Sequence, residues 1–158
     1  MFRYIGLEIK QDKKDIILNQ ANYLNGVHCI SVNAKRAASK YDDINEEEMS
    51  KLKSLVGQLG WLSNNTRPDI SYDVLEISCS FKRPIVDDLL KVNKCVKKLK
   101  ANNLNLIFSN LGDLTKIKLC TFSDASHANL PDGYSSAGGY IVFLVGENGT
   151  CAPPCLGV

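Results

Sequence analysis

The amino-acid sequence predicts an α+β protein in which a β-hairpin, a set of helices and a second group of strands follow one another. Two β-rich runs, 3–10 and 15–18, flank the polar loop QDKK near the start of the chain. Apolar residues recur at helical spacing between about residues 46 and 100. After residue 103 the sequence returns to short apolar runs separated by Gly, Asp and Pro. These changes predict two regions, 1–102 and 103–158.

The helical region is predicted to contain three helices. Asn45 and Glu48 form a capping-box pattern, so a first helix is expected over about 46–63. Pro68 suits the first turn of a second helix, and a further proline separates it from a third helix over about 85–100. The side chains expected to face a common core are Leu52, Val56, Leu59, Ile70, Val74, Ile77, Leu89, Val92 and Val96.

Two segments connect the hairpin to these helices. Tyr23, Leu24 and Val27 recur at helical spacing, which predicts a short helical segment. The stretch from Ser31 to Ile44 is polar and has no clear period, so we interpret it as a linker.

Composition and charge indicate a globular protein and exclude several classes. The chain is 44% hydrophobic and 23% charged, which is typical of a soluble globular domain. The sequence shows neither a signal peptide nor an apolar run long enough to span a membrane. The net charge of +2 gives no general argument for a polyanionic partner. The six cysteines lack CxxC pairs, and we expect reduced thiols in an intracellular, cytoplasmic protein.

One carboxylate carries the clearest catalytic signal. Asp124 lies in the string FSDAS, at the expected end of a strand, where a carboxylate can serve as a metal ligand. A turn-forming aspartate that bonds its own backbone gives the same pattern. Two-metal catalysis also needs several carboxylates around ions about 4 Å apart, which one aspartate does not supply. His127 is interpreted as a loop histidine, and His28 gives a weaker signal still.

The third predicted helix carries a face of lysines. Lys91, Lys94, Lys97 and Lys98 lie opposite its apolar stripe. Lysines at this spacing can follow the phosphates of a nucleic acid. Lysines on the polar face of an amphipathic helix also simply keep it soluble. The pattern therefore fits either a nucleic-acid-binding face or a solvated surface.

Six strings, read in order, resemble one protein family. They are YIGLEI, LNQANYL, LVGQLGWLSNNTRPDISYDV, KVNKCVKKLK, FSDASHANLPDG and GGYIVFL. They resemble the reverse transcriptase-to-ribonuclease H region of copia-type retrotransposon Pol polyproteins over about residues 2–149, and VGQLGWL–TRPDI is the most specific block. The resemblance implies that residues 1–102 match the end of the reverse transcriptase with its thumb-like and connection-like helices. It implies that residues 103–158 begin an incomplete ribonuclease H-like sheet, with Asp124 as the first metal-binding aspartate.

Two departures from this family shape the functional expectation. The family's polymerase aspartates lie in a Tyr-Val-Asp-Asp-like hairpin, which has no equivalent in residues 1–158. The remaining ribonuclease H acids would lie beyond Val158, and CAPPCLGV stands where the family has a Trp-x-Ser-Lys-like strand. The resemblance therefore implies a catalytically inactive fragment with an incomplete metal site at Asp124. We expect no cofactor for this chain, whereas the intact parent would use Mg²⁺.

Two other functions remain open. A co-opted nucleic-acid-binding or protein-interaction module would use the lysine face, and it would bind an RNA–DNA hybrid or a duplex weakly and without sequence preference. An active nuclease would need the missing acids from another chain. No membrane partner is expected, and in the parent the partner is the remainder of the polyprotein.

Overall fold

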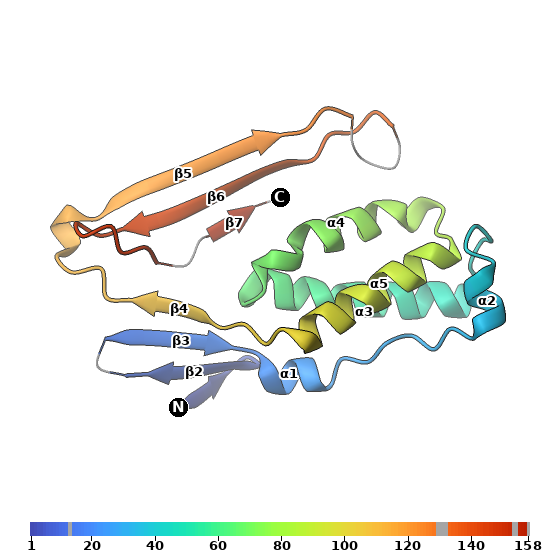
Figure 1. Cartoon of the computed structure of the whole chain (residues 1–158), viewed down its shortest axis with the longest axis horizontal. Coiled ribbons are helices and arrows are strands. Elements are labelled where there is room, and N and C mark those ends of the chain that lie inside the picture. Colours follow the sequence, from blue (N-terminus) through green and yellow to red (C-terminus); the bar gives the residue numbers. More distant parts are fainter. Residues whose placement is uncertain (13, 129–132, 153–154, 158) are drawn as a thin grey trace. The chain divides into compact units, whose positions relative to one another are not determined.

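The computed structural model describes residues 1–12, 14–128, 133–152 and 155–157. The chain divides into two compact units, of which one combines residues 1–20 with 104–158 and the other comprises residues 21–103. Helices and strands are both present (Figure 1), which gives the mixed content that an α+β protein requires. The division into regions 1–102 and 103–158 stays a prediction, as do the thumb-like, connection-like and ribonuclease H-like assignments that the family resemblance implies.

A four-stranded antiparallel sheet begins the first unit. Its strands are β1 (Phe2–Tyr4), β2 (Leu7–Gln11), β3 (Asp15–Asn19) and β4 (Leu106–Ser109), in the order β1-β2-β3-β4. The predicted hairpin is confirmed, since β2 and β3 pair directly. It gains one strand because a tight turn divides the predicted run 3–10.

That turn was not predicted because its first residue is unusual. Ile5 and Gly6 both have positive φ, 48° and 78°, as a two-residue hairpin turn with the correct twist requires. Glycine adopts this conformation readily, whereas a β-branched residue rarely does. The sequence YIGL therefore reads as continuous strand although the chain reverses there.

The short apolar runs after residue 103 form strands, but the first of them joins a different sheet. β5 (Lys118–Ala125), β6 (Gly138–Val145) and β7 (Cys155–Gly157) form a three-stranded antiparallel sheet in that order. The expectation that β4 begins this sheet is wrong, because β4 pairs with β3. This register places Ile16 opposite Phe108 and Leu18 opposite Leu106, so apolar residues meet across the strands.

The β5–β6 pair carries apolar side chains on both faces. Opposite residues share a face, and successive residues alternate between faces. Leu119 faces Leu144 on one side, whereas Phe122 lies opposite Ile141 on the other side, where its ring also contacts Phe143 edge to face. Leu119 and Phe122 remain 71% and 58% exposed.

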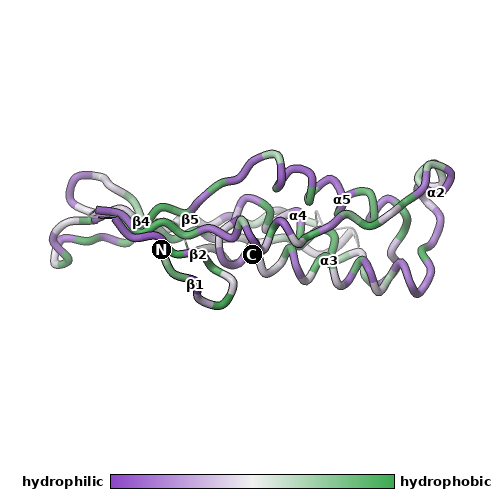
Figure 2. Tube along the Cα trace, turned by 90° about the horizontal axis from the view of Figure 1, so that it is seen from below, coloured by the Kyte–Doolittle hydropathy of each residue, from purple (hydrophilic) through white to green (hydrophobic). Residues whose placement is uncertain are grey.

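The second unit contains the three predicted helices, α3 (Glu46–Asn65), α4 (Ser71–Cys79) and α5 (Val86–Ala101), which pack against one another (Figure 1). Hydrophilic and hydrophobic residues alternate along α3 and α5 (Figure 2), as a core on one side requires. The predicted core side chains are buried together, apart from Val74, which is half-buried against the same cluster. The shorter elements are α1 (Ala21–Asn25), α2 (Ala34–Ala38), η1 (Pro68–Ile70) and η2 (Ser80–Lys82) in this unit and η3 (Leu114–Lys116) in the first.

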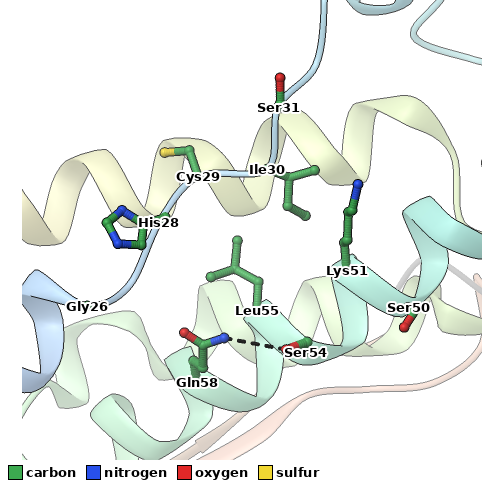
Figure 3. A pocket seen from close by; sticks show the side chains of 10 residues that line it. All are labelled: Gly26, His28, Cys29, Ile30, Ser31, Ser50, Lys51, Ser54, Leu55 and Gln58. Atoms are coloured by element: carbon green, nitrogen blue, oxygen red, sulfur yellow. Dashed lines mark hydrogen bonds between the residues drawn. The ribbon is translucent and has the colours of Figure 1, made fainter.

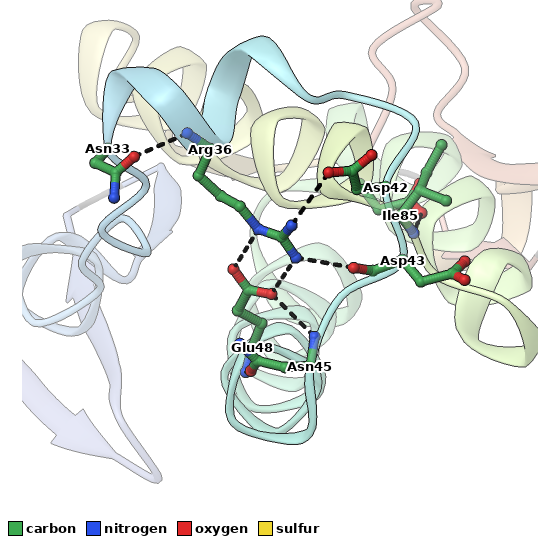
Figure 4. Close-up of polar contacts among 8 residues, drawn as sticks. Asn33, Arg36, Asp42, Asp43, Asn45, Glu48 and Ile85 are labelled. Carbon is green, nitrogen blue, oxygen red and sulfur yellow. Dashed lines mark hydrogen bonds and ion pairs between the residues drawn. The ribbon is translucent and has the colours of Figure 1, made fainter.

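The stretch from Ser31 to Ile44 is not a linker, because α2 and an arginine network hold it in place (Figure 4). Arg36 donates Nε to Glu48 Oε1 at 3.0 Å and Nη2 to Glu48 Oε2 at 2.8 Å. Nη2 also donates to the Asp43 carbonyl at 2.8 Å. Glu48 meanwhile completes the predicted capping box by accepting the Asn45 N–H at 3.0 Å. The network therefore fixes the start of α3.

The TRPD block forms a buried junction at the other end of α3. Arg67 is only 3% exposed and donates Nε and Nη2 to the two carboxylate oxygens of Asp69, both at 2.9 Å. Its Nη1 donates to the carbonyls of Leu99 at 3.3 Å and Asn102 at 2.8 Å. These carbonyls lie at the end of α5, where a helix leaves its last acceptors without internal partners. Arg67 thereby joins the end of α3 to η1 and to α5.

Arg67→Met should destabilise the helical unit by roughly 3 kcal/mol, near the lower end of the range for breaking a buried ion pair, because Asp69 stays partly hydrated. The substitution leaves both α5 carbonyls without their donor. Urea unfolding followed by the fluorescence of Trp61, the single tryptophan and a residue of α3, reports this unit. The exposed α3 residue Lys53 supplies the control, and Lys53→Gln should stay within about 0.5 kcal/mol of the parent. Equal unfolding midpoints for the two variants would contradict the role given to Arg67.

Arg36→Gln should weaken the dependence of folding stability on pH in the acidic range. The hydrogen bonds from Arg36 hold the pKa of Glu48 below its ordinary value of 4.5. A carboxylate with a lowered folded-state pKa stabilises the fold above its unfolded pKa, and this contribution disappears as pH falls through the folded pKa. The difference in unfolding midpoint between parent and variant should therefore be largest near neutral pH and shrink below about pH 4.5. A difference that does not change with pH would show that Arg36 acts through packing alone.

Candidate functional site

The predicted metal ligand Asp124 stands on the exposed part of β5. It lies opposite Gly139 of β6, and its own Oδ1 accepts the Ala125 N–H at 2.9 Å. A bond of this kind is expected of an aspartate whose side chain accepts a hydrogen bond from the neighbouring backbone. His127 is exposed as well. Within the residues that the structure describes, no three His, Cys, Asp or Glu side chains gather into a group that could hold a metal ion. One exposed carboxylate does not fit a two-metal site.

The lysine face of α5 is divided into paired and unpaired charges. Lys91 and Lys98 lie 3.2 Å from carboxylates of α4, those of Glu76 and Asp73 respectively. Lys94 and Lys97 are exposed and form no ion pair or hydrogen bond within the described part of the chain. Sequence reasoning missed the acids because they belong to a neighbouring helix. Their three-residue spacing on α4, which places both on one helix face, was the available signal.

The ion pair affects the protonation of Lys91. Partial burial lowers the pKa of Lys91, but the hydrogen bond to Glu76 and the nearby carboxylates outweigh this effect and raise it. The ammonium group therefore stays charged at neutral pH, and the nearby carboxylates already compensate its positive charge. A polyanion would have to displace Glu76 before it could use this charge fully.

A groove of about 420 Å³ lies between α4 and α5 at these ion pairs. Its lining includes Asp73, Glu76, Lys94 and the buried thiol of Cys95. Burial, reinforced by the nearby Asp73 carboxylate, raises the pKa of Cys95 to about 11. The thiol is therefore protonated at neutral pH, which makes it a poor nucleophile and a poor metal ligand.

A second hollow, of about 460 Å³, lies where the segment after α1 passes α3 (Figure 3). His28 and Ser31 line it from the segment, and Lys51, Ser54 and Gln58 line it from α3. The hollow gives His28 surroundings that sequence reasoning did not foresee. No local motif marks it, because its two walls are about twenty residues apart in the sequence.

In the described part of the chain, no helix is both long and apolar enough to cross a membrane.

Comparisons with known proteins point to mobile elements. No protein-family model matches the chain, and no solved structure matches it. It is 28% identical over 152 residues to a retrovirus-related Pol polyprotein from transposon RE1 of Arabidopsis thaliana, which covers 89% of this chain and 10% of that protein. It is 30% identical over 100 residues to a putative transposon Ty5-1 protein of Saccharomyces cerevisiae, and this alignment covers 63% of this chain and 32% of that protein.

The chain thus spans about a tenth of one relative and about a third of the other. The sequence expectation of a retrotransposon relative receives independent support, at the level of the polyprotein. Together, the two similarities support a chain derived from a transposon Pol polyprotein.

Proposed function

We propose that this chain is a catalytically inactive part of a copia-type retrotransposon Pol polyprotein, from the end of the reverse transcriptase into the start of ribonuclease H. The intact parent would copy RNA into DNA and degrade the RNA strand of the hybrid with Mg²⁺. The order of the six matching strings and the two transposon relatives support this assignment. The observation that carries the inactivity is the exposed position of Asp124, beside which the described residues place no group of acids.

The inactivity follows from what phosphodiester hydrolysis by two metals requires. The ions must be held together so that they stabilise the attacking and the leaving oxygen at once. Asp124 offers one carboxylate, and one of its oxygens already accepts the Ala125 N–H. The described residues add no group of acids to it.

Weak nucleic-acid binding by α5 is the second part of the proposal. Lys94 and Lys97 are exposed, have no ion-pair partner among the described residues, and lie about one helical turn apart. Lys91 and Lys98 contribute less, because Glu76 and Asp73 compensate their charges. Such contacts release counterions from phosphates and do not read bases, so binding should ignore sequence. The same surface would serve a co-opted binding module. Clean exon boundaries around the reading frame would favour this alternative.

The purified chain should not cleave the RNA strand of an RNA–DNA hybrid in the presence of Mg²⁺. A labelled hybrid incubated with the parent chain and with Asp124→Asn should give the same background in both reactions. The two proteins must first show matching unfolding curves, so that folding does not enter the comparison. Cleavage that depends on Mg²⁺ and is lost in Asp124→Asn would refute the proposed inactivity.

Binding to a short duplex should show a shallow salt dependence. Two uncompensated lysines give a slope of log affinity against log salt near −1.8, whereas all four lysines would give about −3.6. The Lys94→Gln/Lys97→Gln double variant should remove most of the slope. The matched Lys91→Gln/Lys98→Gln variant should change it much less, because those charges are paired.

Fluorescence anisotropy at four or more salt concentrations, with a duplex and a hybrid of two unrelated sequences each, measures this slope. A slope near −3.6 would show that the ion pairs to α4 open on binding. Binding that survives the Lys94→Gln/Lys97→Gln substitutions, or that prefers one sequence, would place the contact elsewhere on the chain.

A further inference from the structure

The segment between α1 and α2 is held extended by one side chain of α5. Asn93 Oδ1 accepts the Ile30 N–H at 2.7 Å, and Asn93 Nδ2 donates to the Ile30 carbonyl at 2.8 Å. A residue in a β-strand exchanges the same two hydrogen bonds with an antiparallel neighbour. The Asn93 amide thus takes the place of a neighbouring strand along this edge of the segment.

The opposite edge of the segment is open. In an extended chain the N–H and C=O of alternate residues point to opposite sides, so those of Cys29 and Ser31 point away from Asn93. Within the described residues, no hydrogen bond involves the backbone groups of Cys29 or Ser31. Both side chains are exposed, and the Cys29 thiol lies 3.8 Å from the Asn93 carbonyl. Unpaired strand edges of this kind can accept an added strand.

The hollow of about 460 Å³ described above borders this segment (Figure 3). The segment runs along α3, with His28 at the Gln58 end and Ser31 at the Lys51 end. Ile30 and Leu55 are its apolar lining residues, and Leu55 is only 2% exposed. His28 and Lys51 are its titratable basic groups, and no carboxylate lines it; Lys51 pairs with Glu47 one turn earlier on α3.

We propose that the hollow between residues 27–33 and α3 binds an extended peptide by strand addition, through the backbone of Cys29 and Ser31. The bound peptide carries a carboxylate that competes with Glu47 for Lys51 at one end of the hollow. A peptide fits better than a phosphodiester, because the open edge presents donors and acceptors in alternation whereas a phosphate oxygen only accepts. This inference is independent of the nucleic-acid contacts proposed for α5.

A displayed library of random heptapeptides, selected on the whole chain, tests the proposal. Enriched peptides should carry Asp or Glu at one fixed position. Ser31→Pro removes one N–H from the open edge, yet it leaves Ile30 in the extended conformation that precedes proline. It should weaken binding of the enriched peptides about tenfold. The matched control Ser31→Ala keeps the N–H and should bind within about twofold of the parent.

A second arm uses the unchanged protein, so that a folding defect in Ser31→Pro cannot decide the result. Methylation of each peptide nitrogen in turn should abolish binding at alternate positions, because only one edge of the bound strand faces Cys29 and Ser31. Tolerance of methylation at every position, equal binding by Ser31→Pro and Ser31→Ala, or no enrichment over a selection on Ser31→Pro would each overturn the proposal. Displacement of the peptide by oligo(dT) whose own binding falls in Lys51→Gln would reassign the hollow to phosphates.

Discussion

The guanidinium of Arg67 links three segments of the helical unit, namely the end of α3, η1 and the end of α5. Its N–H groups donate to the carboxylate of Asp69, two residues later, and to the carbonyls of Leu99 and Asn102, more than thirty residues later. A planar group with donors in fixed directions can satisfy all of these at once, whereas a lysine ammonium has three donors on a single nitrogen and cannot match the bidentate carboxylate geometry. The position of α5 relative to α3, and hence of the lysines and of Asn93, depends on this junction. Within the most specific block of the family resemblance, Arg67 and Asp69 thus hold the helical unit together.

Much of the fold could be predicted wherever the determining residues are near each other in sequence. The capping box at Asn45, the apolar stripes of α3 and α5, and the first hairpin all depend on neighbours within a few residues. The pairing of β4 with β3 could not be predicted in this way, because about ninety residues separate the two strands. The linker interpretation of residues 31–44 was wrong for a related reason, since Arg36 reaches Glu48 twelve residues later.

The candidate site shows the same limit. The spacing of the four lysines correctly placed them on one exposed face, but their effective charge depends on Asp73 and Glu76 of another helix. The hydrogen bonds between Asn93 and Ile30 join residues 63 positions apart, and no local pattern indicates them. For Asp124, the local sequence offered a bond to its own backbone as one alternative, which the structure contains, and its role as a metal ligand stays a prediction. Whether other acids surround it is a question of long-range packing.

The β5–β6 pair has a consequence for how this protein behaves in solution. A sheet with apolar side chains on both faces has the character of a middle layer, which folded domains cover on each side. Leu119 and Phe122, on opposite faces, are both largely exposed. Any molecule that covers these faces lowers the free energy of the folded state by mass action, and another copy of the chain can do so. If a second copy covers these faces, the melting temperature of this unit would rise with protein concentration.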